Sequence, residues 1–241
     1  MSTRNSHGAL CLNTPNVLFA DIDFDDPGPS RRLKRWIRSP LLIAALVAGV
    51  WLRSWWVGIG ALVAALIVAD LIYSRIHRHY WLRDGGPERR ANERIDAFVL
   101  ANPEWSFRVY RTPAGLRLLA MHRTFDPGEP AVAACFGALQ ADTIYALMCA
   151  RQHCFRARVS PKPWRIGISE HMRPRPGVWP VKPERMKDRE QWIAAYERAS
   201  LGYAACRYVC DVGSGVVDPI ADDICKLHDS LTGAELALPI G

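Results

Sequence analysis

Hydrophobic and polar residues are arranged along this chain in patterns that predict both strands and helices. Apolar runs at 8–12 and 16–24 are separated by Asn13-Thr14-Pro15, which predicts two strands joined by a turn. Residues 105–111 and 116–122 flank Thr-Pro-Ala-Gly and predict a β-hairpin. Apolar spacings and strand-like runs predict further elements, namely helices at 88–101, at 131–152 in one or two pieces and at 190–200, and a strand at 203–212.

The last helix has the clearest frame. Asp218 is its expected N-cap, Pro219 its first residue and Gly233 its stop signal. Together these elements predict an α+β fold, in which the N-terminal hairpin joins a mixed sheet built mainly from later strands. An apolar stripe with the spacing of a core-facing helix surface consists of Ile220, Ile224, Leu227 and Leu231.

Residues 41–73 form an apolar block whose only charged residues are Arg53 and Asp70. A buried globular helix needs a polar face, so this block is typical of a membrane segment. Two helices fit if the chain turns at Arg53, with lengths of roughly 22 Å for 36–51 and roughly 27 Å for 55–73. Both are a little shorter than a hydrocarbon core of about 30 Å and require bilayer thinning or snorkelling.

Basic residues flank the apolar block on both sides. Because the positive-inside rule places both flanks in the cytoplasm, we expect an even number of crossings. The prediction is a two-helix transmembrane hairpin at 36–81 in the inner membrane, with 1–30 and 85–241 forming a cytoplasmic domain that holds both termini. A single span at 55–73 with 41–52 in the interface, and a buried soluble hairpin, are the alternatives. The flanking residues are Arg31, Arg32, Lys34, Arg35 and Arg38 before the block, and Arg75, Arg78, Arg83, Arg89 and Arg90 after it.

The charge of the chain is concentrated in one segment. The 241 residues include 31 Lys and Arg against 24 Asp and Glu, a net charge of +7. Residues 151–190 hold eleven Lys or Arg and four acids, so they account for the whole excess, and six prolines make them stiff. Such a segment suits an anionic partner, whether a nucleotide phosphate, a nucleic acid or a membrane headgroup. A solvated loop attracted to the anionic inner leaflet is the alternative.

Composition and motifs exclude several classes of protein. The length and the 49% hydrophobic residues exclude intrinsic disorder, and seven cysteines in so long a chain indicate reduced thiols rather than a disulfide scaffold. The sequence has no phosphate-binding loop, dinucleotide fingerprint or hydrolase elbow. The cysteines do not have the spacing of a zinc site. His228, near the end of the last helix, is expected to face the helix dipole.

Asp21-Ile22-Asp23 is the sharpest chemical signal. Alternation in a strand puts both carboxylates on one face, with Ile22 on the other. Two such carboxylates at a strand end can hold Mg²⁺ or Mn²⁺, and a nucleoside triphosphate supplies the remaining oxygen ligands. Asp21 and Asp23 are therefore the candidate metal ligands.

The run Val-Leu-Phe-Ala-Asp-Ile-Asp resembles the first motif of the archaeo-eukaryotic primase superfamily of nucleotidyltransferases. The second motif of that superfamily is a Ser/Thr-Gly turn leading to a nucleotide-binding His. In this sequence Thr112 lies in the turn, and Arg117 is at the position where the family has His. Residues 154–165 are similar to the arginine-rich strand that contacts phosphates in polymerase-type members. The resemblance covers 8–24 and about 95–170, and it implies a primase-like domain with the membrane block as an insertion. The nucleotide-binding residues that it implies are Thr112, Arg117, Arg156, Arg158, Lys162 and Arg165.

The sequence departs from the family pattern in two places. Arg117 can neutralise phosphate but cannot act as a neutral imidazole, so the resemblance supports phosphate binding better than catalysis. The family also uses a third acid, for which Asp142 and Asp211 are the candidates. Asp142 is more simply a helix N-cap, and Asp211 could equally start the Val-Gly-Ser-Gly turn.

Three functions remain open at this point. The first is a membrane protein whose cytoplasmic primase-like domain binds a metal-nucleotide and acts as a nucleotidyltransferase. The second is a non-catalytic, membrane-tethered module that binds nucleotide or nucleic acid. The third, which fits least well, is a D-x-D glycosyltransferase, because only 20 residues precede the motif.

Overall fold

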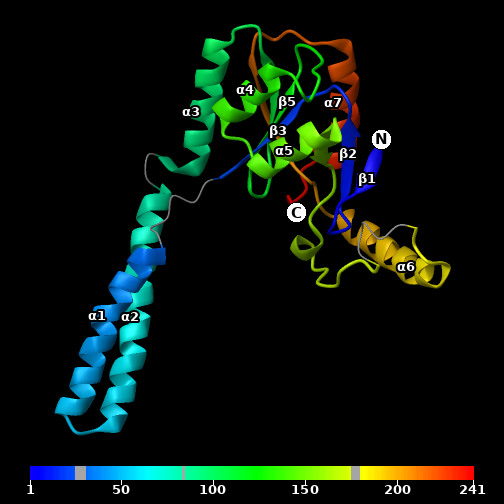
Figure 1. Cartoon of the computed structure of the whole chain (residues 1–241). Helices are drawn as coiled ribbons and strands as arrows, with labels where there is room; N and C mark the ends of the chain where they lie inside the picture. The colour runs from blue at the N-terminus through cyan, green and yellow to red at the C-terminus, as the bar shows by residue number, and fades with distance from the viewer. Residues whose placement is uncertain (25–30, 83–84, 175–179) are drawn as a thin grey trace. The chain divides into compact units, whose positions relative to one another are not determined.

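The computed structural model describes residues 1–24, 31–82, 85–174 and 180–241 (Figure 1). Arg83 and the last six residues of the expected N-terminal part, 25–30, lie outside the described residues. The chain forms two compact units. We call the first, Met1–Phe24 with Ala91–Gly241, the α+β domain, and the second, Asp25–Arg90, the hairpin unit.

The α+β domain contains two antiparallel sheets. The smaller has the strand order β1-β2-β6 and the larger the order β3-β5-β4-β7. The predicted α+β class is confirmed, but a mixed sheet is wrong, since every pairing between the described strands is antiparallel. The strands are β1 (Ser2–Arg4), β2 (Leu10–Thr14), β3 (Phe19–Asp23), β4 (Ser106–Arg111), β5 (Gly115–Ala120), β6 (Phe155–Arg158) and β7 (Arg207–Gly213).

The two strands predicted near the N-terminus, β2 and β3, lie in different sheets, so the expected hairpin between them is wrong. β2 pairs with β6 and β3 pairs with β5, each with a partner that is distant in the sequence. The turn between them is fixed by Thr14, whose buried hydroxyl donates to the carbonyl of Val17 at 2.8 Å. Both strands are apolar enough to be buried, and burial alone does not say which sheet a strand joins.

Helices cover the larger sheet on both faces (Figure 1). Phe98 of α3 packs against Phe107 at 5.9 Å between ring centroids, and His228 of α7 packs against Tyr110 on the opposite face at 4.6 Å. The predicted helix at 131–152 is split in two at Gln140, which adopts a left-handed conformation with φ 52°. The helices are α3 (Gly86–Ala101), α4 (Pro130–Leu139), α5 (Thr143–Gln152), α6 (Pro183–Ser200) and α7 (Pro219–Thr232), with a 3₁₀ turn η2 at Pro163–Arg165.

The last helix is capped as predicted, but it buries a different face. The Asp218 side chain accepts hydrogen bonds from the first turn, and Gly233 ends the helix with φ 65°. Small and polar residues face the sheet, where Ala221 and Cys225 join the hydrophobic core and His228 contacts the rings of Phe19 and Tyr110. The buried face is Ala221, Cys225, His228 and Thr232. The apolar stripe expected there lies largely at the surface instead, at Ile220, Leu227 and Leu231, with Ile224 partly buried.

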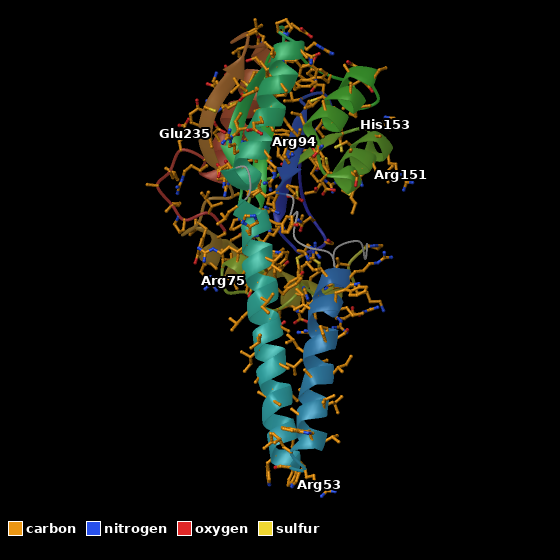
Figure 2. The ribbon with its side chains drawn as sticks, turned by 90° about the vertical axis from the view of Figure 1, so that its left-hand side faces the viewer. Arg53, Arg75, Arg94, Arg151, His153 and Glu235 are labelled. Atoms are coloured by element: carbon orange, nitrogen blue, oxygen red, sulfur yellow. The ribbon has the colours of Figure 1, made fainter. Side chains whose placement is uncertain are left out.

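The hairpin unit consists of α1 (Arg31–Trp51) and α2 (Trp55–Leu82), joined by a turn with Arg53 at its tip (Figure 2). The helices meet closely beside the turn, since a Cβ on Gly49 would lie 2.8 Å from the Cα of Gly58. At the other end, Asp70 of α2 accepts a hydrogen bond of 2.8 Å from Arg38 of α1. Both helices and the turn therefore lie where the sequence predicts them.

Among the described residues, one helix is long and apolar enough to cross a membrane by length and composition, and it begins at Trp55. Its apolar window has a mean hydropathy of 2.1 and is only 11% buried. α1 begins with several basic residues, which lower its mean hydropathy. Large apolar side chains are exposed along both helices, with Trp51 at 82% and Leu71 at 60%.

Candidate functional site

The two acids of the D-x-D motif end β3, an edge strand of the larger sheet. Asp21 is opposite Arg117 of β5 in the register, and Ile22 between the two acids is fully buried. Asp21 is partly buried, whereas Asp23 is exposed. The alternation expected for this strand therefore holds, with the two acids on the face away from Ile22.

Arg117 engages Asp21 with both sides of its guanidinium. Its Nε donates to Oδ1 at 2.7 Å and its Nη2 donates to Oδ2 at 3.0 Å. Only 2% of the Arg117 side chain is exposed. Both carboxylate oxygens of Asp21 are thus occupied by a buried, bidentate ion pair, the geometry in which Arg and carboxylate bind most strongly.

The third nitrogen of Arg117 joins the two sheets. Its Nη1 donates at 2.7 Å to the carbonyl of Arg158, which belongs to β6 of the smaller sheet. The guanidinium therefore contacts both sheets and has no exposed surface to offer a phosphate. The structure assigns Arg117 to the interior of the domain, in contrast to the ligand contact that the resemblance implies.

The two acids of the motif have opposite pKa shifts. Burial alone would raise the pKa of Asp21, but the charge and hydrogen bonds of Arg117 outweigh it and hold this pKa below its usual range. Partial burial raises the pKa of Asp23, and the negative charges of Asp21 and Asp142 raise it further. Asp21 is therefore stabilised as an anion paired with Arg117, and Asp23 is the carboxylate of the motif that remains available.

The two candidate third acids lie in different places. The carboxylate of Asp142 caps α5, accepting from the backbone N–H of Ile144 at 2.8 Å, and its own N–H donates to the carbonyl of Asp21 at 3.1 Å. Asp142 is therefore near the motif and has the capping role that the sequence also allows. Asp211 lies on β7, at the opposite edge of the sheet from β3, where Tyr208 donates to it. The structure brings Asp142, and not Asp211, to the motif.

Two of the residues implied by the resemblance have structural partners. The buried Thr112 closes the β4–β5 turn, with its Oγ1 accepting from the N–H of Gly115 at 3.0 Å. Arg156 donates from Nε to the Oδ1 of Asn13 on the neighbouring strand β2 at 2.7 Å. Thr112 thus stabilises a turn, and Arg156 links two strands of the smaller sheet.

The remaining three residues form what we call the basic cluster, which consists of Arg158, Lys162 and Arg165. The Nε of Arg158 is buried without a hydrogen-bond partner among the described residues. Burial lowers the pKa of Arg158, and the neighbouring charges of Arg117 and Arg165 lower it further. Burial likewise lowers the pKa of Lys162, together with the charges of Arg158 and Arg165. The carboxylates of Asp21 and Asp23 act in the opposite direction, but the pKa of both cations stays lowered, so the cluster favours an added anion.

The donors at the motif do not fit a bound metal ion. Asp21 has no oxygen free of Arg117, and Asp142 uses one oxygen in capping. Within the described ranges, no three His, Cys, Asp or Glu side chains are grouped so as to hold a metal. Mg²⁺ and Mn²⁺ prefer several oxygen ligands, of which this arrangement leaves Asp23 and one oxygen of Asp142.

Two features of the site region were not anticipated from the sequence. His228 is fully buried and bonds to Asp229 at 3.0 Å, a burial that its expected place near the end of the last helix did not indicate. Trp164, between Lys162 and Arg165 of the basic cluster, is 49% exposed. The sequence signal for His228 was its spacing with Ala221 and Cys225 on one helix face, and for Trp164 its position inside a basic, proline-rich run.

Comparison of the chain with protein-family models, with curated proteins and with solved structures found no match.

Proposed function

We propose that the protein is a membrane-anchored binding module, whose α+β domain binds a phosphate-bearing ligand, a nucleotide or a nucleic acid, at the basic cluster. The observation that carries the proposal is the buried Nε of Arg158, which has no partner among the described residues and lies beside the charges of Arg117 and Arg165. The site works by charge neutralisation and not by metal-dependent catalysis.

The state of Asp21 favours this function over nucleotidyl transfer. A catalytic carboxylate of the primase type must be free to ligate a metal that bridges to the triphosphate. Releasing Asp21 would leave Arg117, which is 2% exposed, as an unpaired buried cation. The primase resemblance is therefore retained in the proposal only as an indication of phosphate binding, and a D-x-D glycosyltransferase needs the same free carboxylates.

A phosphate suits the basic cluster because phosphate oxygens accept several hydrogen bonds at once. A buried guanidinium nitrogen without a hydrogen-bond acceptor, such as the Nε of Arg158, is unfavourable, and a charge-assisted hydrogen bond to an anion is short and strong. Lys162 contributes a second, half-buried cation, and the exposed Arg165 a third. A ligand with two or more phosphates carries enough acceptor oxygens for all three cations.

The hairpin unit provides the proposed anchor. Its apolar side chains are exposed along both helices, which in water would be a large unfavourable surface and in lipid is favourable. Asp70 forms ion pairs with Arg38 and Lys34, and these lie toward the basic N-terminal end of α1 and not beside the turn. Arg53 at the turn reaches the far headgroups by snorkelling. We propose an inner-membrane hairpin with the α+β domain in the cytoplasm.

Calorimetry on the full chain in detergent micelles, with inorganic tripolyphosphate as the probe, tests the binding site. We expect binding in the presence of EDTA, and a loss of affinity of about tenfold for Arg158→Ala, the usual effect of removing a charge-assisted contact. Lys226→Ala is the matched control. It also removes one positive charge, but from α7, where Lys226 pairs with Asp222.

Asp23→Asn separates the proposal from the metal-dependent alternative. Removing a negative charge beside Lys162 should leave binding of tripolyphosphate unchanged or strengthen it, whereas a metal ligand at this position would be lost. Binding that needs Mn²⁺ and disappears in Asp23→Asn would overturn the proposal in favour of a metal-nucleotide site.

The exposed Cys210 of β7 tests the membrane topology. An impermeant thiol reagent should not label Cys210 in intact cells. The same reagent should label Cys210 once the cells are permeabilised. Labelling of Cys210 in intact cells would place the α+β domain outside the cytoplasm.

A further inference from the structure

An exposed aromatic surface lies directly beside the basic cluster. Trp164 belongs to the 3₁₀ turn η2 and is half exposed, while Pro163, which begins the turn, and Ile166, which follows it, are buried. The N–H groups of Arg165 and Ile166 donate back to Lys162 and Pro163, which closes the turn. The indole is therefore displayed on a short, well-anchored segment.

A second exposed ring flanks the indole. His7 lies edge-on to Trp164, with 4.9 Å between the ring centroids. The loop that carries His7 is fixed by Asn5, whose side chain accepts from the N–H groups of His7 and Ala9. Gly8 in the same loop has φ 90°, and a Cβ there would lie 2.4 Å from the ring of Trp192, so this loop allows no larger residue.

The ammonium of Lys162 lies 5.4 Å from the centre of the Trp164 ring, which places a member of the basic cluster next to the exposed indole. Any of the nucleobases can stack on such a ring, and the phosphates of the same nucleotide are attracted by the adjacent cations.

We propose that Trp164, flanked by His7, is the platform on which the base of a nucleoside polyphosphate stacks while Arg158, Lys162 and Arg165 bind its phosphates. The inference rests on the proposed phosphate site and names its ligand class. A single aromatic platform beside one compact cluster of cations matches one base and its phosphate chain, whereas a nucleic-acid strand is usually bound by a series of stacking rings. A flat membrane surface is a poorer fit. The Nε of Arg158 is buried below the surface, and the negative charge of Asp23, close to Arg158 and Lys162, would repel anionic headgroups.

The experiment compares ATP with inorganic tripolyphosphate on the full chain in nanodiscs of neutral lipid, by calorimetry. Wild-type protein should bind ATP about tenfold more tightly than tripolyphosphate, although ATP carries less charge, because stacking adds to the phosphate contacts. Trp164→Leu should abolish this difference and leave tripolyphosphate binding unchanged. Trp164→Phe should retain most of it. Leu100→Ala, which removes an exposed apolar side chain from α3, is the control and should behave as wild type.

Three results would overturn the proposed stacking on Trp164 without affecting the phosphate site. The first is that wild-type protein binds ATP and tripolyphosphate equally, and the second is that Trp164→Leu weakens binding of ATP and of tripolyphosphate equally. The third is that oligonucleotides bind far more tightly than ATP. Loss of ATP affinity in anionic nanodiscs, seen in wild type and not in Trp164→Leu, would show that lipid occupies the ring and would also overturn it. Failure of both ATP and tripolyphosphate to bind would instead overturn the proposed function itself.

Discussion

At the scale of single residues, the interior of the α+β domain is organised around the buried ion pair of Arg117 and Asp21. Removing charges of this kind from water is unfavourable, and the pair is tolerated because all three nitrogen groups of Arg117 have acceptors. The sequence identifies both residues as important, but it predicts that they bind a ligand, Asp21 through a metal ion and Arg117 through a phosphate. Their cross-strand registry, which makes them partners, depends on which strands pair and cannot be read from either segment alone.

Arg117→Met should destabilise the protein by about 3 kcal/mol, because it leaves the Asp21 carboxylate partly buried without its partner. The double variant Arg117→Met with Asp21→Asn removes both charges and should recover much of that loss. Urea unfolding followed by near-UV circular dichroism measures the three free energies. If the double variant is as unstable as the sum of the single ones, the two residues do not act as a pair.

His228 should make stability depend on pH. Burial lowers its pKa below the ordinary value of 6.5, and the bond to Asp229 does not compensate. The unfolded chain therefore binds a proton that the folded protein does not, so stability should fall as pH decreases from about 7 to 5, with a slope of up to about 1.4 kcal/mol per pH unit.

His228→Gln should reduce this slope, while the exposed His153 at the end of α5 provides the control variant His153→Gln (Figure 2). Melting temperatures between pH 5 and 7.5 give the comparison. His122, whose pKa burial also lowers, accounts for a remaining dependence. An unchanged slope in His228→Gln would mean that His228 is protonated in the folded state.

At the scale of elements, capping residues were the most predictable features, because their chemistry is local. Asp142, Asp218, Pro219 and Gly233 have the roles that their positions indicate. The buried face of α7 was not predictable in the same way. The apolar stripe is a property of the helix alone, whereas the face that packs depends on a sheet surface that carries Arg108 and Tyr110.

Asp142→Ala should cost about 1 kcal/mol of stability through loss of the α5 cap, and Asp142→Asn should cost little, because Asn caps nearly as well. The same urea titration measures both. Tripolyphosphate binding should survive in Asp142→Asn. A stable Asp142→Asn protein that no longer binds would assign the carboxylate a role at the ligand.

At the scale of the whole molecule, the chain is an α+β domain interrupted by a helical hairpin unit. The apolar block was visible in the sequence because its composition differs so strongly from the rest. The sheet arrangement was not visible, since β2 and β3 are similar short strands that pair with partners more than 90 residues away. Local pattern predicts elements, and long-range pairing decides the sheets.

Replacing residues 31–82 with a Gly/Ser linker should leave a soluble, folded α+β domain, because its core is made by residues of Met1–Phe24 and Ala91–Gly241 alone. Size-exclusion chromatography and a cooperative unfolding transition check this. A molten or aggregated product at every salt concentration would show that the domain needs the hairpin for folding.

The pairing of β2 with β6 also constrains the order of events during synthesis. The partner of Leu12 is Ala157, so roughly 145 residues must follow β2 out of the ribosome before the smaller sheet can close, about 7 to 30 s at ordinary elongation rates. The hairpin emerges inside that interval. β1 and β2 can pair with each other soon after they emerge, but β2 and β3 remain without their partners β6 and β5 until both helices of the hairpin unit have been synthesised.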